Sequence, residues 1–140
     1  MTNNEATQQD YIKRVNLVVD YIDKNLDKEI KLTTLAEISS FSPYHLHRIV
    51  RSFLKEPIGV YITRRRVHKA ASLLRSTDLS IQDIAYRVGY DMPSSLSKAF
   101  KQFYNVSPSE YRTNKNIVIM NRNISKEEYN LQEPQIVERP

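Results

Sequence analysis

The chain has 140 residues, of which 40% are hydrophobic and 26% are charged, and its net charge is +5 at pH 7. These proportions are typical of a soluble globular protein. The absence of cysteine excludes disulfides, zinc–thiolate sites and cysteine nucleophiles, and it suits a reducing cytoplasm. No run of about 18 apolar residues exists to span a membrane, and the N-terminal MTNNEATQQDYIKR lacks the basic start and apolar core of a signal peptide.

The positive charge is concentrated in one part of the chain. Between Pro43 and Arg75 the only acidic residue is Glu56, whereas acidic residues are frequent among the first thirty. A local excess of this kind favours a binding face for a polyanion. The basic residues of the segment are Arg48, Arg51, Lys55, Arg64, Arg65, Arg66, Lys69 and Arg75.

The first half of the chain predicts three helices after a flexible, polar segment at residues 1–8. The first helix is expected from about Gln9 to Asp27, and a second from Leu32 to Ser39. The third begins at Pro43 after the N-cap Ser42, and Lys55-Glu56-Pro57 ends it. The apolar residues spaced for the buried face of the first helix are Ile12, Val15, Val19, Ile22 and Leu26.

The second half predicts four more helices. A long helix runs from about Val60 to Arg75, and Ser80 caps the next, which ends at Val88-Gly89. Another begins near Met92-Pro93, and Ser107 caps a short one. Because no alternating strand pattern occurs before residue 113, we predict an all-α fold of about seven helices. Residues 113–140 form a polar tail without periodicity.

Two segments of the chain resemble each other. LTTLAEISSFSPYHLHRIVRSF aligns with SIQDIAYRVGYDMPSSLSKAFKQF, and each predicts a short helix, a tight turn and a second helix with outward basic residues. This is the pattern of a helix-turn-helix; the alternative is a helical hairpin repeated for packing alone. The matched residues are Ala36 with Ala85, Phe41 with Tyr90, Pro43 with Pro93, Leu46 with Leu96, Arg48 with Lys98, Arg51 with Lys101 and Phe53 with Phe103.

Residues 9–112 closely resemble the DNA-binding domain of AraC/XylS transcription regulators. The motifs are SPYHLHRIVRSF, GVYITRRRVHKAASLL and, most specifically, SIQDIAYRVGYDMPSSLSKAFKQFYNVSPSEYR. The resemblance implies two helix-turn-helix subdomains, homeodomain-like three-helix units at 9–57 and 77–112, joined by a linker helix at 58–76. It also implies double-stranded DNA as partner, RNA polymerase as a second partner, no cofactor and no catalytic activity.

The sequence departs from the family pattern at three helix ends. Lys55 and Asn105 stand where family members often have glycine, and Lys31 replaces the usual serine cap, which Ser80 keeps in the second unit. Because lysine tolerates the left-handed conformation less well than asparagine, we expect the end of the first recognition helix to differ. We also expect the first unit to be the less stable one.

Outward residues in the N-terminal half of a recognition helix read base edges. The resemblance points to Tyr44, His47 and Arg48 in the first unit, where Arg48 is suited to a bidentate pair with guanine. In the second unit Lys98 is the best candidate reader, because serines discriminate weakly. The predicted base-reading residues are Tyr44, His47, Arg48, Ser94, Ser95, Ser97 and Lys98, and the predicted phosphate contacts are Thr34, His45, Arg51 and Lys101.

Several of these residues, and the arginine run of the long helix, have alternative interpretations. A metal site is disfavoured, because His45 and His47 stand two residues apart and point to different sides of a helix; His45 can also pack at the helix edge. In the run Arg64-Arg65-Arg66 a structural or solvated role is favoured over DNA contact. Outward tyrosine and arginine also suit a protein-interaction module. An enzyme is rejected, because no carboxylate pair, Ser–His–Asp arrangement or cysteine is present.

The linker helix sets the expected geometry on DNA. About fifteen residues span roughly 22 Å, so a rigid link would require the duplex to bend to meet both helices in successive major-groove turns about 34 Å apart. The terminal LQEPQIVERP resembles the opening of a GyrI-like effector-binding domain; the alternative is a tail without function. A small-molecule effector would then act only through that domain. The target site and the choice between activation and repression stay open.

Overall fold

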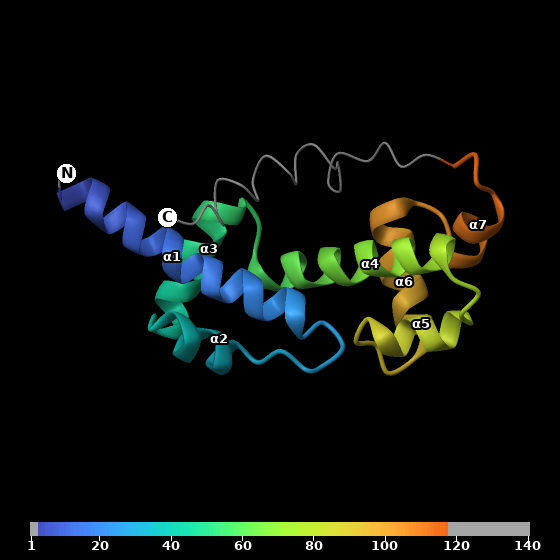
Figure 1. Ribbon diagram of the computed structural model, residues 1–140, viewed down its shortest axis with the longest axis horizontal. Coiled ribbons are helices and arrows are strands. Elements are labelled where there is room, and N and C mark those ends of the chain that lie inside the picture. The colour runs from blue at the N-terminus through green and yellow to red at the C-terminus, as the bar shows by residue number, and fades with distance from the viewer. Residues whose placement is uncertain (1–2, 118–140) are drawn as a thin grey trace. The chain divides into compact units, whose positions relative to one another are not determined.

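The computed structural model describes residues 3–117, and all secondary structure in that range is helical. The predicted all-α fold is therefore confirmed (Figure 1). No helix of the described range is both long and apolar enough to cross a bilayer. The seven helices of residues 3–117 are α1 (Asn3–Lys24), α2 (Leu32–Ser39), α3 (Pro43–Leu54), α4 (Ile58–Ser76), α5 (Ile81–Arg87), α6 (Pro93–Tyr104) and α7 (Pro108–Thr113).

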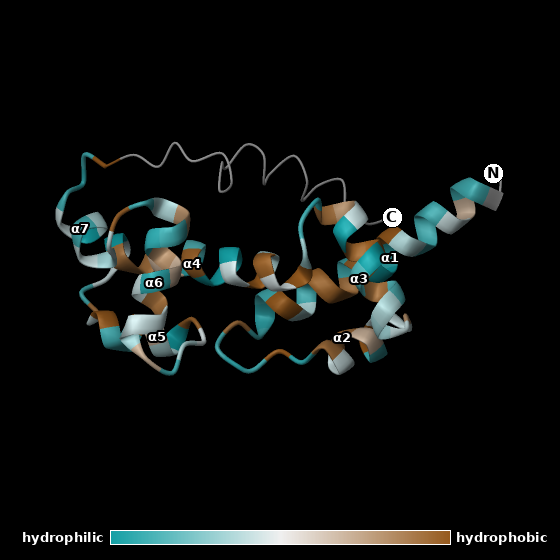
Figure 2. Ribbon diagram, turned by 180° about the vertical axis from the view of Figure 1, so that it is seen from behind, coloured by the Kyte–Doolittle hydropathy of each residue, from teal (hydrophilic) through white to brown (hydrophobic). Residues whose placement is uncertain are grey.

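The start of α1 differs from the prediction. The helix begins at Asn3 rather than near Gln9, and its residues from Asn4 to Asp10 are exposed. Figure 2 shows these first turns as mostly hydrophilic. An apolar period cannot reveal a helical segment that buries nothing. The good helix formers in this segment and Glu5 in the first turn, where it complements the helix dipole, account for the extension.

The end of α1 also differs. The helix stops at Lys24 instead of Asp27, and the backbone N–H of Asn25 closes a tighter turn on the Ile22 carbonyl at 3.1 Å. Leu26 is nevertheless buried, at 4% exposure. The apolar spacing therefore identified Val15, Val19, Ile22 and Leu26 as buried, although the last of them lies in a loop. Ile12, predicted with them, is only half-buried, and the buried Val18 was not predicted.

The chain divides into two compact units, with the boundary between Tyr61 and Ile62 inside α4. In the first unit α1, α2 and α3 pack on one another. The second unit contains the rest of α4 with α5, α6 and α7, and it also includes the loop at 26–29. The predicted subdomain limits at residues 57 and 76 stay a prediction.

Each unit has its own apolar core. In the first, α3 contributes Leu46, Val50 and Leu54, whereas Phe53, the counterpart of Phe103 in the repeat, is only half-buried. In the second, α6 contributes Leu96, Ala99, Phe100 and Phe103. The remaining buried residues of the first unit include Val15, Val18, Val19, Ile22, Leu35, Ala36, Phe41, Ile58 and Tyr61.

The internal repeat is longer than the sequence comparison indicated. Buried residues of α1 recur in α4 at a constant offset of 52, so each helix-turn-helix has an equivalent long helix before it. The repeated element is therefore a three-helix unit. The matched buried pairs are Val15 with Val67, Val18 with Ala70, Val19 with Ala71 and Ile22 with Leu74.

The turn of the first helix-turn-helix depends on a left-handed residue. Ser40 has φ of 60°, and its N–H donates to the Glu37 carbonyl, while the N–H of Phe41 donates to the Ala36 carbonyl at 3.2 Å. This is the hydrogen-bond pattern of a Schellman C-cap. Phe41 is thereby turned inward, where it is 5% exposed.

The second turn repeats this arrangement. Gly89 has φ of +100°, and the N–H of Tyr90 donates to the Ala85 carbonyl at 2.8 Å. A Cβ on Gly89 would lie 2.0 Å from the Leu26 carbonyl oxygen and 2.8 Å from Nε of Arg66. Glycine is thus required here both by the backbone conformation and by the close approach of the 26–29 loop.

Helices α3 and α6 end in the same way. Lys55 after α3 has φ of 65° and Asn105 after α6 has φ of 64°, so the expected difference between the two ends was wrong. At the start of α2, Lys31 makes no side-chain cap bond, whereas the Ser80 hydroxyl accepts from the N–H of Asp83 at 3.0 Å. The missing cap of the first unit is therefore confirmed.

Candidate nucleic-acid interface

Helix α3 exposes a polar face because its cap and core fix its orientation. The Ser42 hydroxyl accepts from the backbone N–H of His45 at 3.2 Å, and Pro43 occupies the first helical position. With Leu46 and Val50 fully buried, the opposite side must face solvent. The exposed residues on it include Tyr44, His47, Arg48 and Arg51.

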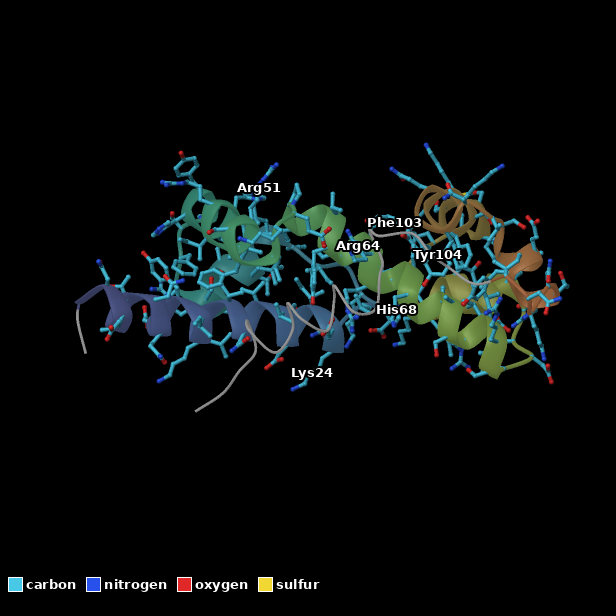
Figure 3. The ribbon with its side chains drawn as sticks, turned by 90° about the horizontal axis from the view of Figure 1, so that it is seen from above. Lys24, Arg51, Arg64, His68, Phe103 and Tyr104 are labelled. Carbon is cyan, nitrogen blue, oxygen red and sulfur yellow. The ribbon has the colours of Figure 1, made fainter. Side chains whose placement is uncertain are left out.

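Tyr44 and Arg48 lie in the N-terminal half of this exposed face of α3. The Tyr44 side chain is 73% exposed, and the Arg48 guanidinium carbon lies 5.9 Å from the centre of its ring. Arg51 lies one turn further along, on the side of α3 away from α1 (Figure 3). The three side chains present an aromatic surface and two cations along one helix face.

The two histidines of α3 have different environments. The His45 ring is half-buried and meets Phe41 and Tyr11 edge to face, with centroids 5.1 and 5.9 Å away. His47 is exposed. Within residues 3–117 no group of three His, Cys, Asp or Glu side chains is placed to hold a metal ion. His45 thus packs at the helix edge, and its phosphate contact stays a prediction.

Helix α6 also exposes a polar face, but the side chains on it differ from those of α3. Its outer face carries Ser94, Ser95, Lys98 and Lys101, all exposed, while Ser97 is half-buried. The N-cap residue Met92 makes no side-chain cap bond. Compared with α3, this face offers hydroxyls and lysines in place of aromatic rings and guanidinium groups.

The charge of both faces is uncompensated by any acidic residue within the described range. Neither α3 nor α6 contains an acidic residue, and no carboxylate within residues 3–117 pairs with Arg48, Arg51, Lys98 or Lys101. Unpaired cations on an exposed helix favour an anionic partner. Thr34, the predicted phosphate contact of α2, is half-buried.

The arginine run of α4 has a structural role at two of its three positions. Arg66 donates to the carbonyl oxygens of Leu26 and Lys28 at 3.1 and 2.8 Å, and it lies 5.8 Å from the Tyr90 ring centre. Arg64 lies 5.5 Å from the Phe103 ring centre (Figure 3). These contacts agree with the structural interpretation of the run.

Sequence reasoning missed Arg14 of α1, which is important for the first turn. Its guanidinium donates to the carbonyl oxygens of Ser39 and Ser40 at 2.6 and 2.5 Å and lies 3.7 Å from the Phe41 ring centre. Arg14 thus holds the C-terminus of α2 against α1. Its counterpart at the offset of 52 is Arg66, so the extended repeat contained the signal that identifies both residues.

A family model described as a helix-turn-helix domain matches residues 35–114. The chain is 36% identical over 98 residues to the HTH-type transcriptional activator AarP of Providencia stuartii, covering 70% of this chain and 73% of AarP. It is 32% identical over 98 residues to the regulatory protein SoxS of Salmonella typhimurium, covering 70% of this chain and 92% of SoxS.

Solved structures are similar over the same region. The C-terminal domain of AraT, a response regulator from Geobacillus stearothermophilus, superposes with a TM-score of 0.66 at 38% identity, over 73% of this chain and 83% of that one. The DNA-binding domain of AdpA, a global transcriptional factor solved with a target DNA, gives 0.67 at 28% identity, over 70% and 88%. The chain therefore belongs to the AraC family of helix-turn-helix, DNA-binding transcription regulators.

Proposed function

We propose that this chain recognises a specific duplex DNA site by inserting α3 and α6 into successive major-groove turns. The observation that carries the proposal is that both helices expose a polar face without an acidic residue, whose two cations pair with no carboxylate within residues 3–117. The AdpA domain, which was solved with its target DNA, supports this use of the fold.

In the first unit, α3 supplies most of the base discrimination. Tyr44, His47 and Arg48 occupy the exposed N-terminal half of the helix, the part that meets base edges in a helix-turn-helix. Arg48 pairs with a guanine through O6 and N7, the commonest specific contact in the major groove. Arg51 lies one turn further along and binds a phosphate, and Thr34 and His45 make further phosphate contacts.

In the second unit, α6 binds more tolerantly. Ser94 and Ser95 both donate and accept hydrogen bonds, so they accommodate several bases, and the half-buried Ser97 reaches less far. Lys98 is the principal reader of this helix, and Lys101 binds a phosphate. Specificity is thus unequal between the two halves of the site.

Bending of the DNA follows from the length of the connecting helix. The 19 residues of α4 correspond to about 28 Å, which is less than the roughly 34 Å between successive major-groove turns. We therefore propose that α4 links two subdomains, at 9–57 and 77–112, and that the duplex bends toward the protein. The sequence dependence of that bending adds to specificity.

The regulatory setting is also proposed. AarP is named a transcriptional activator, which supports activation, and with it a contact to RNA polymerase in the cytoplasm, for this chain. The resemblance of residues 131–140 to a GyrI-like domain, through which an effector would act, lies outside the described residues.

The substitution Arg48→Ala tests the proposal. After selection of bound sites from random duplexes, the variant should bind the preferred site about 1–3 kcal/mol less tightly and lose its base preference at one position, because a bidentate pair is removed. Lys13→Ala is the matched control, since it removes an exposed cation from α1. A gel shift with titrated duplex measures both affinities.

Two outcomes would contradict the proposal. If Arg48→Ala bound the preferred site as tightly as the parent chain, the assignment of α3 as the principal reader would be wrong. If the parent chain bound no duplex even at low salt, a protein-interaction module would be the better description.

A further inference from the structure

Met92 stands directly before α6, and its side chain is 58% exposed. Within residues 3–117 the most exposed large hydrophobic side chains are Tyr44 and Met92, and both lie at the start of a proposed recognition helix. Met92 is also outside the hydrophobic cluster of the second unit. Packing of the core therefore does not explain why a methionine occupies this position.

Capping does not explain it either. Met92 is the N-cap residue of α6 and has no side-chain oxygen to accept an N–H. The equivalent residue of α3 is Ser42, whose hydroxyl accepts from His45, and Ser107 caps α7 in the same way. A methionine at an N-cap leaves α6 less stable than a serine would.

The position of Met92 places it beside the polar face of α6. The N–H of Ser95 donates to the Met92 carbonyl at 3.1 Å, so these two residues are adjacent across the first turn. Ser95 and Lys98 are exposed on the helix that begins there. The N-terminal end of a recognition helix is the end that contacts base edges.

The chemistry of the major groove contains one apolar feature that suits this side chain, the C5-methyl group of thymine. The serines and lysines of α6 offer only hydrogen bonds and charge, whereas the flexible thioether of methionine adapts to an apolar surface. We infer that Met92 packs on a thymine methyl and makes thymine a requirement at the base pair facing the start of α6. This inference rests on the proposed function.

Replacing thymine by deoxyuracil removes only the methyl group, which makes the test specific. In the duplex selected by the parent chain, each thymine is replaced in turn by deoxyuracil. At one position the parent chain should bind about fourfold more weakly, the loss expected for one buried methyl group. Met92→Ala should bind thymine and deoxyuracil equally there, and Met92→Leu should retain the preference. Leu17→Ala, which removes an exposed apolar side chain from α1, should behave as the parent chain.

A second variant separates recognition from folding. Met92→Ser should raise the melting temperature by roughly 3–6 °C, because it supplies the missing cap, while losing the preference for thymine. A lower melting temperature would show that the methionine serves the fold and would overturn the inference. The inference would also be overturned if the parent chain bound its site specifically but no thymine-to-deoxyuracil replacement affected the parent chain and Met92→Ala differently. If the proposed function itself were wrong, no duplex would be selected at all, so this outcome is distinguishable from a wrong inference about Met92.

Discussion

At the scale of single residues, Gly89 and Arg66 are constrained by the same loop. The carbonyl oxygen of Leu26 accepts from Nε of Arg66 at 3.1 Å and lies where a Cβ of residue 89 would be. Tyr90, which follows the glycine, is half-buried, and the burial raises the pKa of its hydroxyl while the nearby Arg66 lowers it. The turn at Gly89 and the side chain of Arg66 therefore both pack against the 26–29 loop, and each constrains the other.

Gly89→Ala should lower the free energy of unfolding by more than about 2 kcal/mol, because alanine at φ of +100° is strained and its Cβ would clash with backbone. Gly59→Ala is the matched control: a Cβ there meets nothing within 4 Å, and the residue is helical. That variant should be unchanged or more stable by about 0.4–1 kcal/mol. Urea unfolding measures both, and equal effects would refute the role assigned to Gly89.

Tyr104 gives the second unit a defined response to alkaline pH. Burial raises the pKa of its hydroxyl, Tyr111 raises it further and Arg75 lowers it. Unfolded tyrosine ionises near pH 10, so the stabilising contribution is complete below that pH and is lost as the pH rises through the higher folded pKa. Urea unfolding from pH 8 to 12 should show stability falling above about pH 10, with a smaller fall for Tyr104→Phe. An identical fall in both proteins would contradict this account.

At the scale of helices, α4 and α7 each donate hydrogen bonds from an arginine to backbone carbonyl groups at the end of the other. Arg112 of α7 donates to the Leu74 and Thr77 carbonyl oxygens at the end of α4, at 2.9 and 3.1 Å. Arg75 of α4 donates to the Tyr111 carbonyl and lies 3.6 Å from the Tyr111 ring centre. Each helix C-terminus is thus neutralised by a cation from the other helix.

Arg112→Ala should therefore destabilise the protein by on the order of 1–2 kcal/mol, because two carbonyl groups lose charged donors. Arg87→Ala removes an exposed arginine from the last turn of α5 and serves as the control. Thermal unfolding should show a lower melting temperature for the first variant and little change for the second. Equal melting temperatures would show that Arg112 contributes little to holding α7 in place.

The limits of a helix could be predicted from the sequence where its residues bury an apolar face. α2 was predicted at its observed limits and α6 at its observed start, since apolar spacing coincided with turn and cap residues. The first turns of α1 bury nothing, so no periodic signal marked them. The left-handed conformation of Lys55 could not be predicted from propensity, because it is stabilised by an αL cap in which the N–H of Lys55 donates to the Arg51 carbonyl at 2.9 Å.

The interface was predictable only in part, for a related reason. The exposure of Tyr44, His47 and Arg48 followed from the buried period of α3. Arg14 was missed, because its interactions with backbone carbonyls in α2 leave no local pattern in the sequence. For Met92 the sequence predicts only a position at a helix start, since its exposure depends on the three-dimensional packing of the second unit.

At the scale of the whole molecule, one three-helix plan is used twice with different surfaces. Both units place an arginine from the preceding long helix beside the aromatic residue of the turn, Arg14 with Phe41 and Arg66 with Tyr90. The turn geometry is thereby preserved, while the exposed residues of α3 and α6 have diverged. The repeat gives α3 and α6 equivalent positions in their units, and under the proposed function the difference between their exposed faces accounts for selectivity.

Methylation interference tests the central claim, that both recognition helices occupy the major groove of one duplex. Guanine N7 lies in the major groove, so a methyl group there blocks a helix that reads that base pair. With the selected duplex, we predict two clusters of interfering guanines centred about 10 base pairs apart, one for each helix. Arg48→Ala should weaken the interference in one cluster and leave the other intact. A single cluster, or binding that no guanine methylation disturbs, would contradict the account.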